Sequence, residues 1–118
     1  MSVPLRPRLR NQHAKPGKVP KLSAGELAAG LPEIPAWALD GTVVDGQRLT
    51  RGVKFKDFVA LMRFVNRMAD LAEAEKHHPD FAVHYNQLDL TLWTHDAGGL
   101  TENDLVLAAR IDALLTEE

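Results

Sequence analysis

Histidines and carboxylates that can exchange protons cluster in the second half of this 118-residue chain. His77 and His78 are adjacent, His95 follows later, and Glu73 and Asp104 flank the group. Imidazole gains and loses its proton near neutral pH, so it can serve as an acid or as a base under ordinary conditions. These residue types therefore predict proton-transfer chemistry, provided that the fold brings them together.

The adjacent histidines lie where a predicted helix gives way to a loop. Carbonyl groups at a helix C-terminus favour a protonated imidazole by up to about 2 kcal/mol, so His77 or His78 can act as a general acid. A histidine in a last turn is also common as a solvated cap, and spacing alone favours that interpretation. His95 ends a predicted strand, where it either faces the mouth of the sheet or is exposed. His84 has no partner at a telling spacing and is interpreted as a surface residue.

Both acids also have a purely structural interpretation. Glu73 lies one helical turn before His77, so it can orient that ring or be one more surface charge. Asp104 follows Thr101 by three residues, as in a capping box, in which it would only tie down the start of a helix.

Clustered histidines also suggest a zinc site, and other catalytic classes leave sequence signatures. Adjacent His77 and His78 cannot easily face the same ion, and the sequence contains neither HxH nor HExxH. The absence of cysteine excludes thiolate ligands and cysteine nucleophiles. GxSxG and GxxxxGK[ST] are missing as well. Acid–base chemistry is therefore favoured over metal binding, and neither a metal nor a cofactor is predicted.

Charge is distributed unevenly along the chain. Residues 1–21 carry six basic residues, four prolines and no acid, which leaves eight basic and sixteen acidic residues in 22–118. An acidic domain argues against direct binding of nucleic acid. The leader 1–21 is predicted to be disordered, although it can also contact an acidic partner. No apolar run has the length of a membrane span and no secretory signal is evident, so a soluble cytoplasmic protein is expected.

Apolar periodicity predicts one domain over residues 22–118. The expected elements are a short helix over 23–29 that begins at a Ser23/Glu26 capping box, strands at 37–39 and 48–55, a long helix over 56–77, strands at 81–86 and 88–94, and a last helix from Thr101. Apart from the leading helix, the order is β-β-α-β-β-α. This order favours an α+β fold, in which helices pack on one face of a four-stranded antiparallel sheet.

Taken together, these residues resemble the pterin-4a-carbinolamine dehydratase family. The family pattern is an acid, three spacers, His-His-Pro, an aromatic residue, a histidine and an aspartate. It is met in order by Glu73, His77, His78, Pro79, Tyr85, His95 and Asp104. The run TxWTHDAGGLT, the KFKDF before the long helix and Trp37 extend the similarity to about residues 22–116.

The resemblance implies a hydro-lyase that dehydrates 4a-hydroxytetrahydropterin to quinonoid dihydropterin. Loss of the C4a hydroxyl needs an acid and removal of the N5 proton needs a base, and imidazoles can do both without a metal or cofactor. The resemblance implies that His77 and His95 are the acid and the base. The sequence does not determine which histidine has which role. The resemblance also implies that His78 binds and positions the pterin and that Asp104 orients a histidine or the substrate. Glu73 and Trp37 would complete the substrate-binding set by supporting the pocket.

Family members form dimers and tetramers, so a homodimer or homotetramer is implied. Two departures favour a different function: the basic leader, and Trp93 where relatives usually carry a small residue. Trp93 can fill the pocket or mark a surface for a protein partner, which residues 1–21 can also contact. The alternative is a catalytically silent binding module, such as a dimerisation cofactor of a transcription factor or a Rubisco assembly factor of carboxysome-bearing bacteria. The complete histidine set favours catalysis.

Overall fold

The computed structural model describes residues 8–41 and 46–117. Its elements are, in order, η1 (Leu9–Asn11), α1 (Ala24–Gly30), η2 (Leu31–Glu33), β1 (Ala38–Asp40), β2 (Arg48–Lys54), α2 (Phe58–Glu75), β3 (Asp80–His84), β4 (Gln87–Leu92), η3 (His95–Ala97) and α3 (Glu102–Thr116). The η elements are single 3₁₀ turns. This order confirms the predicted α+β architecture with a short leading helix.

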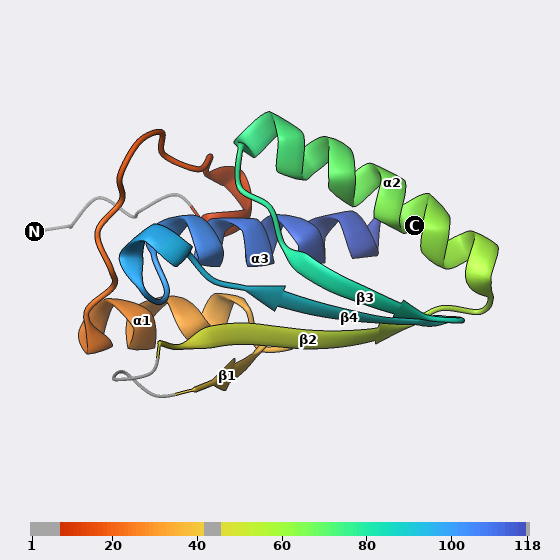
Figure 1. The fold of residues 1–118 in the computed structure, drawn as a ribbon, viewed down its shortest axis with the longest axis horizontal. Coiled ribbons are helices and arrows are strands. Elements are labelled where there is room, and N and C mark those ends of the chain that lie inside the picture. The colour runs from red at the N-terminus through yellow and green to blue at the C-terminus, as the bar shows by residue number, and fades with distance from the viewer. Residues whose placement is uncertain (1–7, 42–45, 118) are drawn as a thin grey trace, which may run out of the picture.

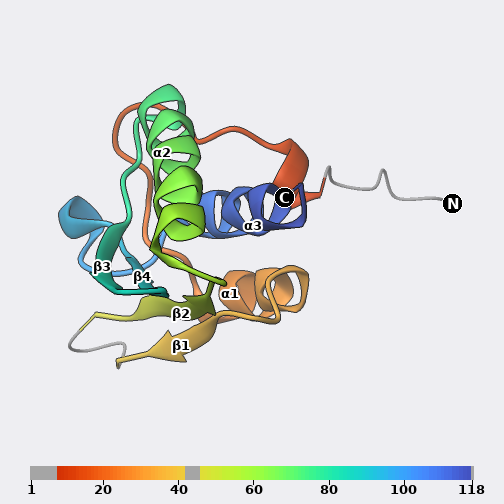
Figure 2. The same ribbon diagram turned by 90° about the vertical axis from the view of Figure 1, so that its right-hand side faces the viewer.

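All four strands belong to one antiparallel sheet in the order β1-β2-β4-β3. Leu90 of β4 lies opposite Arg51 of β2 on one side and Phe81 of β3 on the other. Because alternate residues of a strand point to opposite faces, this register directs Leu88, Leu90 and Leu92 to the same face. Figures 1 and 2 show the three α-helices gathered on one face of the sheet.

The core fills the space between the leucine face of the sheet and the helices. Leu88, Leu90 and Leu92 are at most 1% exposed. The side chains of α2 and α3 that pack in the same cluster include Leu61, Phe64, Met68, Leu105, Leu107 and Ile111. Burial of this apolar surface is the main force that holds the layers together, at roughly 25 cal/mol per Å².

The long helix α2 begins at a cap and ends earlier than predicted. The Asp57 carboxylate accepts the backbone N–H of Ala60, so Asp57 is the N-cap and the helix begins at Phe58. Lys76 adopts a left-handed conformation (φ 53°), which ends the helix at Glu75 rather than at 76 or 77. Among the described residues, no helix combines the length and hydrophobicity that crossing a bilayer requires.

The ends of the second hairpin also differ from the prediction. Tyr85 has a φ of 53° and forms the turn with Asn86, so β3 stops at His84 instead of continuing to 86. The other strand, β4, ends at Leu92 because the chain folds back to bridge Thr94 with Gly99. His95 therefore lies in the turn η3 and not at the end of the strand.

Residues 8–21 follow a defined course along α3, although the sequence predicted a disordered leader over 1–21 (Figure 1). Leu9 is 5% exposed, and its N–H donates to the Glu33 carboxylate at 3.0 Å. The segment has no periodicity because its only regular element is the single 3₁₀ turn η1. Its order comes from long-range side-chain partners instead. Residues 1–7 of the predicted leader lie outside the described residues.

We expect Leu90→Ala to lower the free energy of unfolding by about 3 kcal/mol, because it leaves a cavity at a site that is 1% exposed. Urea denaturation followed by circular dichroism measures this loss. The control is Leu39→Ala in the edge strand β1, where the side chain is 40% exposed and the loss should be below about 1 kcal/mol. Equal losses for both variants would contradict the register.

Candidate active site

A buried carboxylate holds the first histidine of the pair. His77 Nε2 lies 2.6 Å from Asp104 Oδ1, and the Asp104 side chain is fully buried while that of His77 is 13% exposed. His77 follows the end of α2, and its backbone N–H still donates to Ala72. Asp104 lies in the first turn of α3. The contact therefore joins the end of one helix to the start of another.

The second oxygen of Asp104 binds two threonines. Asp104 Oδ2 accepts the Thr94 hydroxyl at 2.7 Å and the Thr101 backbone N–H at 2.9 Å. The contact with Thr101 is half of the predicted capping box, which is present at the start of α3. Both sequence interpretations of Asp104 therefore hold at once, since it caps a helix and contacts a histidine. A buried carboxylate with several charge-assisted hydrogen bonds keeps its partners in one orientation.

The second histidine pairs with the other acid. His78 Nε2 lies 2.6 Å from Glu73 Oε2, and the two side chains are 60% and 78% exposed. The sequence suggested instead that Glu73 orients His77. That suggestion assumed a helix that continues to His77, whereas the left-handed Lys76 turns the chain and brings His78 back over the last turn.

His95 is exposed and packs against an aromatic side chain. Its ring centroid lies 3.7 Å from that of Trp93, with 44° between the planes. The Arg48 guanidinium lies 4.3 Å from the Trp93 ring centroid, and the indole N–H donates to Asp80 at 3.2 Å. Trp93 is half-buried and does not belong to the hydrophobic core. It forms part of the surface around His95.

Asp104 also links the two histidine-bearing segments of the chain. Thr94, whose hydroxyl binds Asp104, directly precedes His95. His77 binds the same carboxylate through its other oxygen. The end of α2 and the loop after β4 are therefore tied to one buried group.

Trp37 lies away from this cluster. Its indole N–H donates to Asp112 Oδ1 at 2.8 Å, and Asp112 is also paired with Arg51. Burial raises the pKa of the Asp112 carboxyl, and the contacts with Trp37 and Arg51 only partly oppose that effect. Asp112 is eight residues beyond Asp104, or about 12 Å along α3. The structure thus gives Trp37 contacts in the core and none with the histidines.

A cleft of about 1170 Å³ lies beside His77. The end of α2, Thr94 and Asp96 form one wall, and residues 14–21 form the other. This second wall was not predicted, because more than fifty residues separate residues 14–21 from His77 and no local sequence pattern connects them. Within residues 8–41 and 46–117, no three histidine or carboxylate side chains are arranged to hold a metal.

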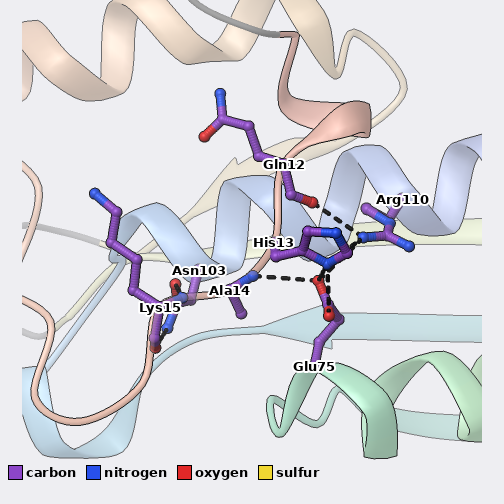
Figure 3. A network of polar contacts seen from close by, with 7 residues as sticks. All are labelled: Gln12, His13, Ala14, Lys15, Glu75, Asn103 and Arg110. Carbon is purple, nitrogen blue, oxygen red and sulfur yellow. Dashed lines mark hydrogen bonds and ion pairs between the residues drawn. The ribbon is translucent and has the colours of Figure 1, made fainter.

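Glu75 attaches the N-terminal segment to the end of α2 (Figure 3). Its carboxylate lies 3.1 Å from His13 Nδ1, accepts the Ala14 N–H at 3.2 Å and pairs with Arg110 at 3.1 Å. The Glu75 side chain is 7% exposed. Burial opposes its ionisation, but the bonds from His13 and Ala14 and the charge of Arg110 outweigh burial and lower its pKa.

The model of the family described as pterin 4 alpha carbinolamine dehydratase matches residues 20–114. The chain belongs to this family. The resemblance that the histidine pattern suggested is therefore confirmed, and the matched region begins close to the predicted domain boundary at residue 22.

Relatives in several bacteria match most of this dehydratase-family chain. A protein of Acidobacterium capsulatum is 52% identical over 95 residues, which cover 80% of this chain and 98% of the relative. A protein of Stenotrophomonas maltophilia is 48% identical over 94 residues, covering 80% and 78%. A protein of Xanthomonas campestris is 39% identical over 111 residues and 92% of both chains, so its similarity reaches into the first 21 residues. All three are provisionally named pterin-4-alpha-carbinolamine dehydratases.

Two solved structures share the dehydratase fold. A transcriptional coactivator/pterin dehydratase of Brucella melitensis has a TM-score of 0.70 at 34% identity, covering 80% of this chain and 97% of that one. A pterin dehydratase-like protein identified as a RuBisCO assembly factor in the alpha-carboxysome has a TM-score of 0.58 at 25% identity, covering 67% and 88%. The descriptions of these two proteins differ in function, so the fold alone does not distinguish catalysis from binding.

We expect Glu75→Gln to lower the free energy of unfolding at pH 7 by about 1–2 kcal/mol, since it removes a buried charged acceptor. The folded pKa of Glu75 is below its ordinary value of 4.5, so its stabilising effect is complete above that pH and is lost as the pH falls through the lowered value. The difference between wild type and variant should therefore shrink in acid. Urea titrations at several pH values measure it, with Asp70→Asn on the exposed side of α2 as the control. A difference that is constant with pH would contradict the assignment.

Proposed function

We propose that the protein is a hydro-lyase that dehydrates 4a-hydroxytetrahydropterins to quinonoid dihydropterins. Family membership supports this activity. The observation that carries the proposal is the double attachment to Asp104, which binds His77 directly and holds the segment of His95 through Thr94. One histidine of the family pattern and the residue before another are thereby bound to a single buried group.

The proposed reaction needs one proton donated and one removed. Protonation of the C4a hydroxyl lets it leave as water, and the C4a–O bond breaks. The N5 proton passes to a base, and the electrons of the N5–H bond form the C4a=N5 double bond. Two imidazoles of opposite protonation state supply both steps and leave the site with its total protonation unchanged.

The contacts favour His78 and His95 as the pair that exchanges protons. Both rings are exposed and can meet a substrate, and Glu73 holds the His78 ring through a contact of 2.6 Å. His77 has its Nε2 committed to the buried Asp104 and is 13% exposed. We therefore assign His77 and Asp104 to positioning, in place of the catalytic role that the sequence suggested for His77. Trp37 contributes to the core and not to the pocket.

We expect His78→Ala and His95→Ala each to lower kcat/KM for a carbinolamine pterin by about 10²- to 10⁴-fold, the usual contribution of a general acid or base. Stopped-flow absorbance of dihydropterin formation measures the rate. The control is His84→Ala: His84 is exposed on β3, and its Nε2 lies 3.7 Å from Asp89. Wild-type rates in both test variants would remove the catalytic assignment.

A non-enzymatic binding module is the second candidate function. The likeness to the RuBisCO assembly factor supports it, as does the contact of Arg48 with Trp93 beside the exposed His95. This candidate predicts that purified Rubisco co-elutes with the protein in size-exclusion chromatography and that Trp93→Ala abolishes co-elution. It also predicts that wild type does not accelerate dehydration. Turnover by wild type without co-elution excludes it.

A further inference from the structure

Residues 15–21, here called the N-terminal arch, are attached at both ends to the region that holds His77. At one end, the Lys15 N–H donates to Asn103 Oδ1 at 2.8 Å and Asn103 Nδ2 donates to the Lys15 carbonyl at 2.9 Å. At the other end, Lys21 forms a backbone bridge with Thr101. Asn103 and Thr101 both adjoin Asp104. The arch and His77 are thus fixed to the same turn of the chain.

The composition of the arch limits its conformations. Pro16 and Pro20 near its two ends restrict φ, while Gly17 permits a turn with a φ of 75° at a cost in conformational entropy. The Lys21 side chain lies across Gly99, where a Cβ would be 2.9 Å from the lysine Cε. Residues with few accessible conformations lose little entropy on ordering. The arch therefore serves as a fixed wall of the cleft.

Positive charge predominates in the cleft between the arch and His77. Four lysines line it, against two carboxylates: Lys15, Lys18, Lys21 and Lys76, with Glu75 and Asp96. Within residues 8–41 and 46–117, no carboxylate lies within ion-pair distance of Lys18 or Lys76, and both are exposed. Like charges in a concave site attract an anion, since the walls limit screening by water. A volume of about 1170 Å³ also exceeds what a bicyclic ring occupies.

We propose that the N-terminal arch is the second wall of the pterin site, and that Lys18 of the arch together with Lys76 selects pterins with an anionic substituent, a carboxylate or a phosphate. This inference rests on the proposed function. The ring would lie toward His77 and Thr94, which line the cleft and directly precede His78 and His95. The anionic substituent would lie toward Lys18 and Lys76. The anion recognised is then part of the substrate and not a free ion.

The test compares the affinity of two stable, oxidised pterins by quenching of their fluorescence. Pterin-6-carboxylate carries the anionic group and 6-hydroxymethylpterin does not. We expect wild type to bind the carboxylate about tenfold more tightly at low ionic strength, with the preference decreasing as salt is added. Lys18→Ser combined with Lys76→Ser should reduce the preference to about twofold or less. Neither pterin undergoes dehydration, so the result does not depend on activity.

The matched control is Lys54→Ser, which removes an exposed lysine at the far end of β2 and should retain the full preference. Equal affinity of wild type for the two pterins overturns the inference, whatever the dehydratase assay gives. A preference that survives in the double variant also overturns it. Inorganic phosphate is the third probe: binding as tight as that of the carboxylated pterin means that an anion alone is recognised and overturns the assignment to pterins. A tenfold preference in a protein without turnover supports the binding site and excludes the catalytic proposal.

Discussion

The buried Asp104 carboxylate is the constraint on which the arrangement of this molecule depends. An ionised carboxylate inside a protein is costly unless hydrogen bonds replace the water it has lost. Asp104 obtains them from Thr101 at the start of α3, Thr94 after β4 and His77 after α2. Three separate segments of the chain are therefore held in fixed positions by one carboxylate, and the loss of any of these contacts would leave that carboxylate with too few hydrogen bonds.

The same turn also fixes the N-terminal segment. Asn103 binds both backbone groups of Lys15, and Thr101 bridges Lys21, while Glu75 binds the segment from the other helix. The candidate site is thus built around the rigid first turn of α3. A site supported by a helix end keeps its geometry better than one formed by loops alone. This support explains how a segment without regular structure can form a wall of the cleft.

The sheet contributes the register of the residues that reach the site. Leu88, Leu90 and Leu92 must face the helices, and a shift of β4 by one residue would turn all three toward solvent. The positions of Trp93 and Thr94 directly after the strand are fixed by the same requirement. Trp93 consequently lies outside the core, against Arg48 and His95. Packing of the core thereby determines which groups surround the exposed histidine.

Patterns carried by neighbouring residues were predictable from the sequence, including both capping boxes, the leucine alternation of β4 and the ordered histidine motif that identified the family. The partner of Glu73 was not, because it depends on one left-handed residue that ends α2 two residues before His77. The position of Trp37 and the path of residues 8–21 were not predictable either, since their partners lie 24 to 98 residues away.

The sequence alone determined the elements, the family and the chemical groups available to it. Only the tertiary structure decided which groups meet, because that choice is made by burial and hydrogen bonding between distant segments, which local spacing does not encode.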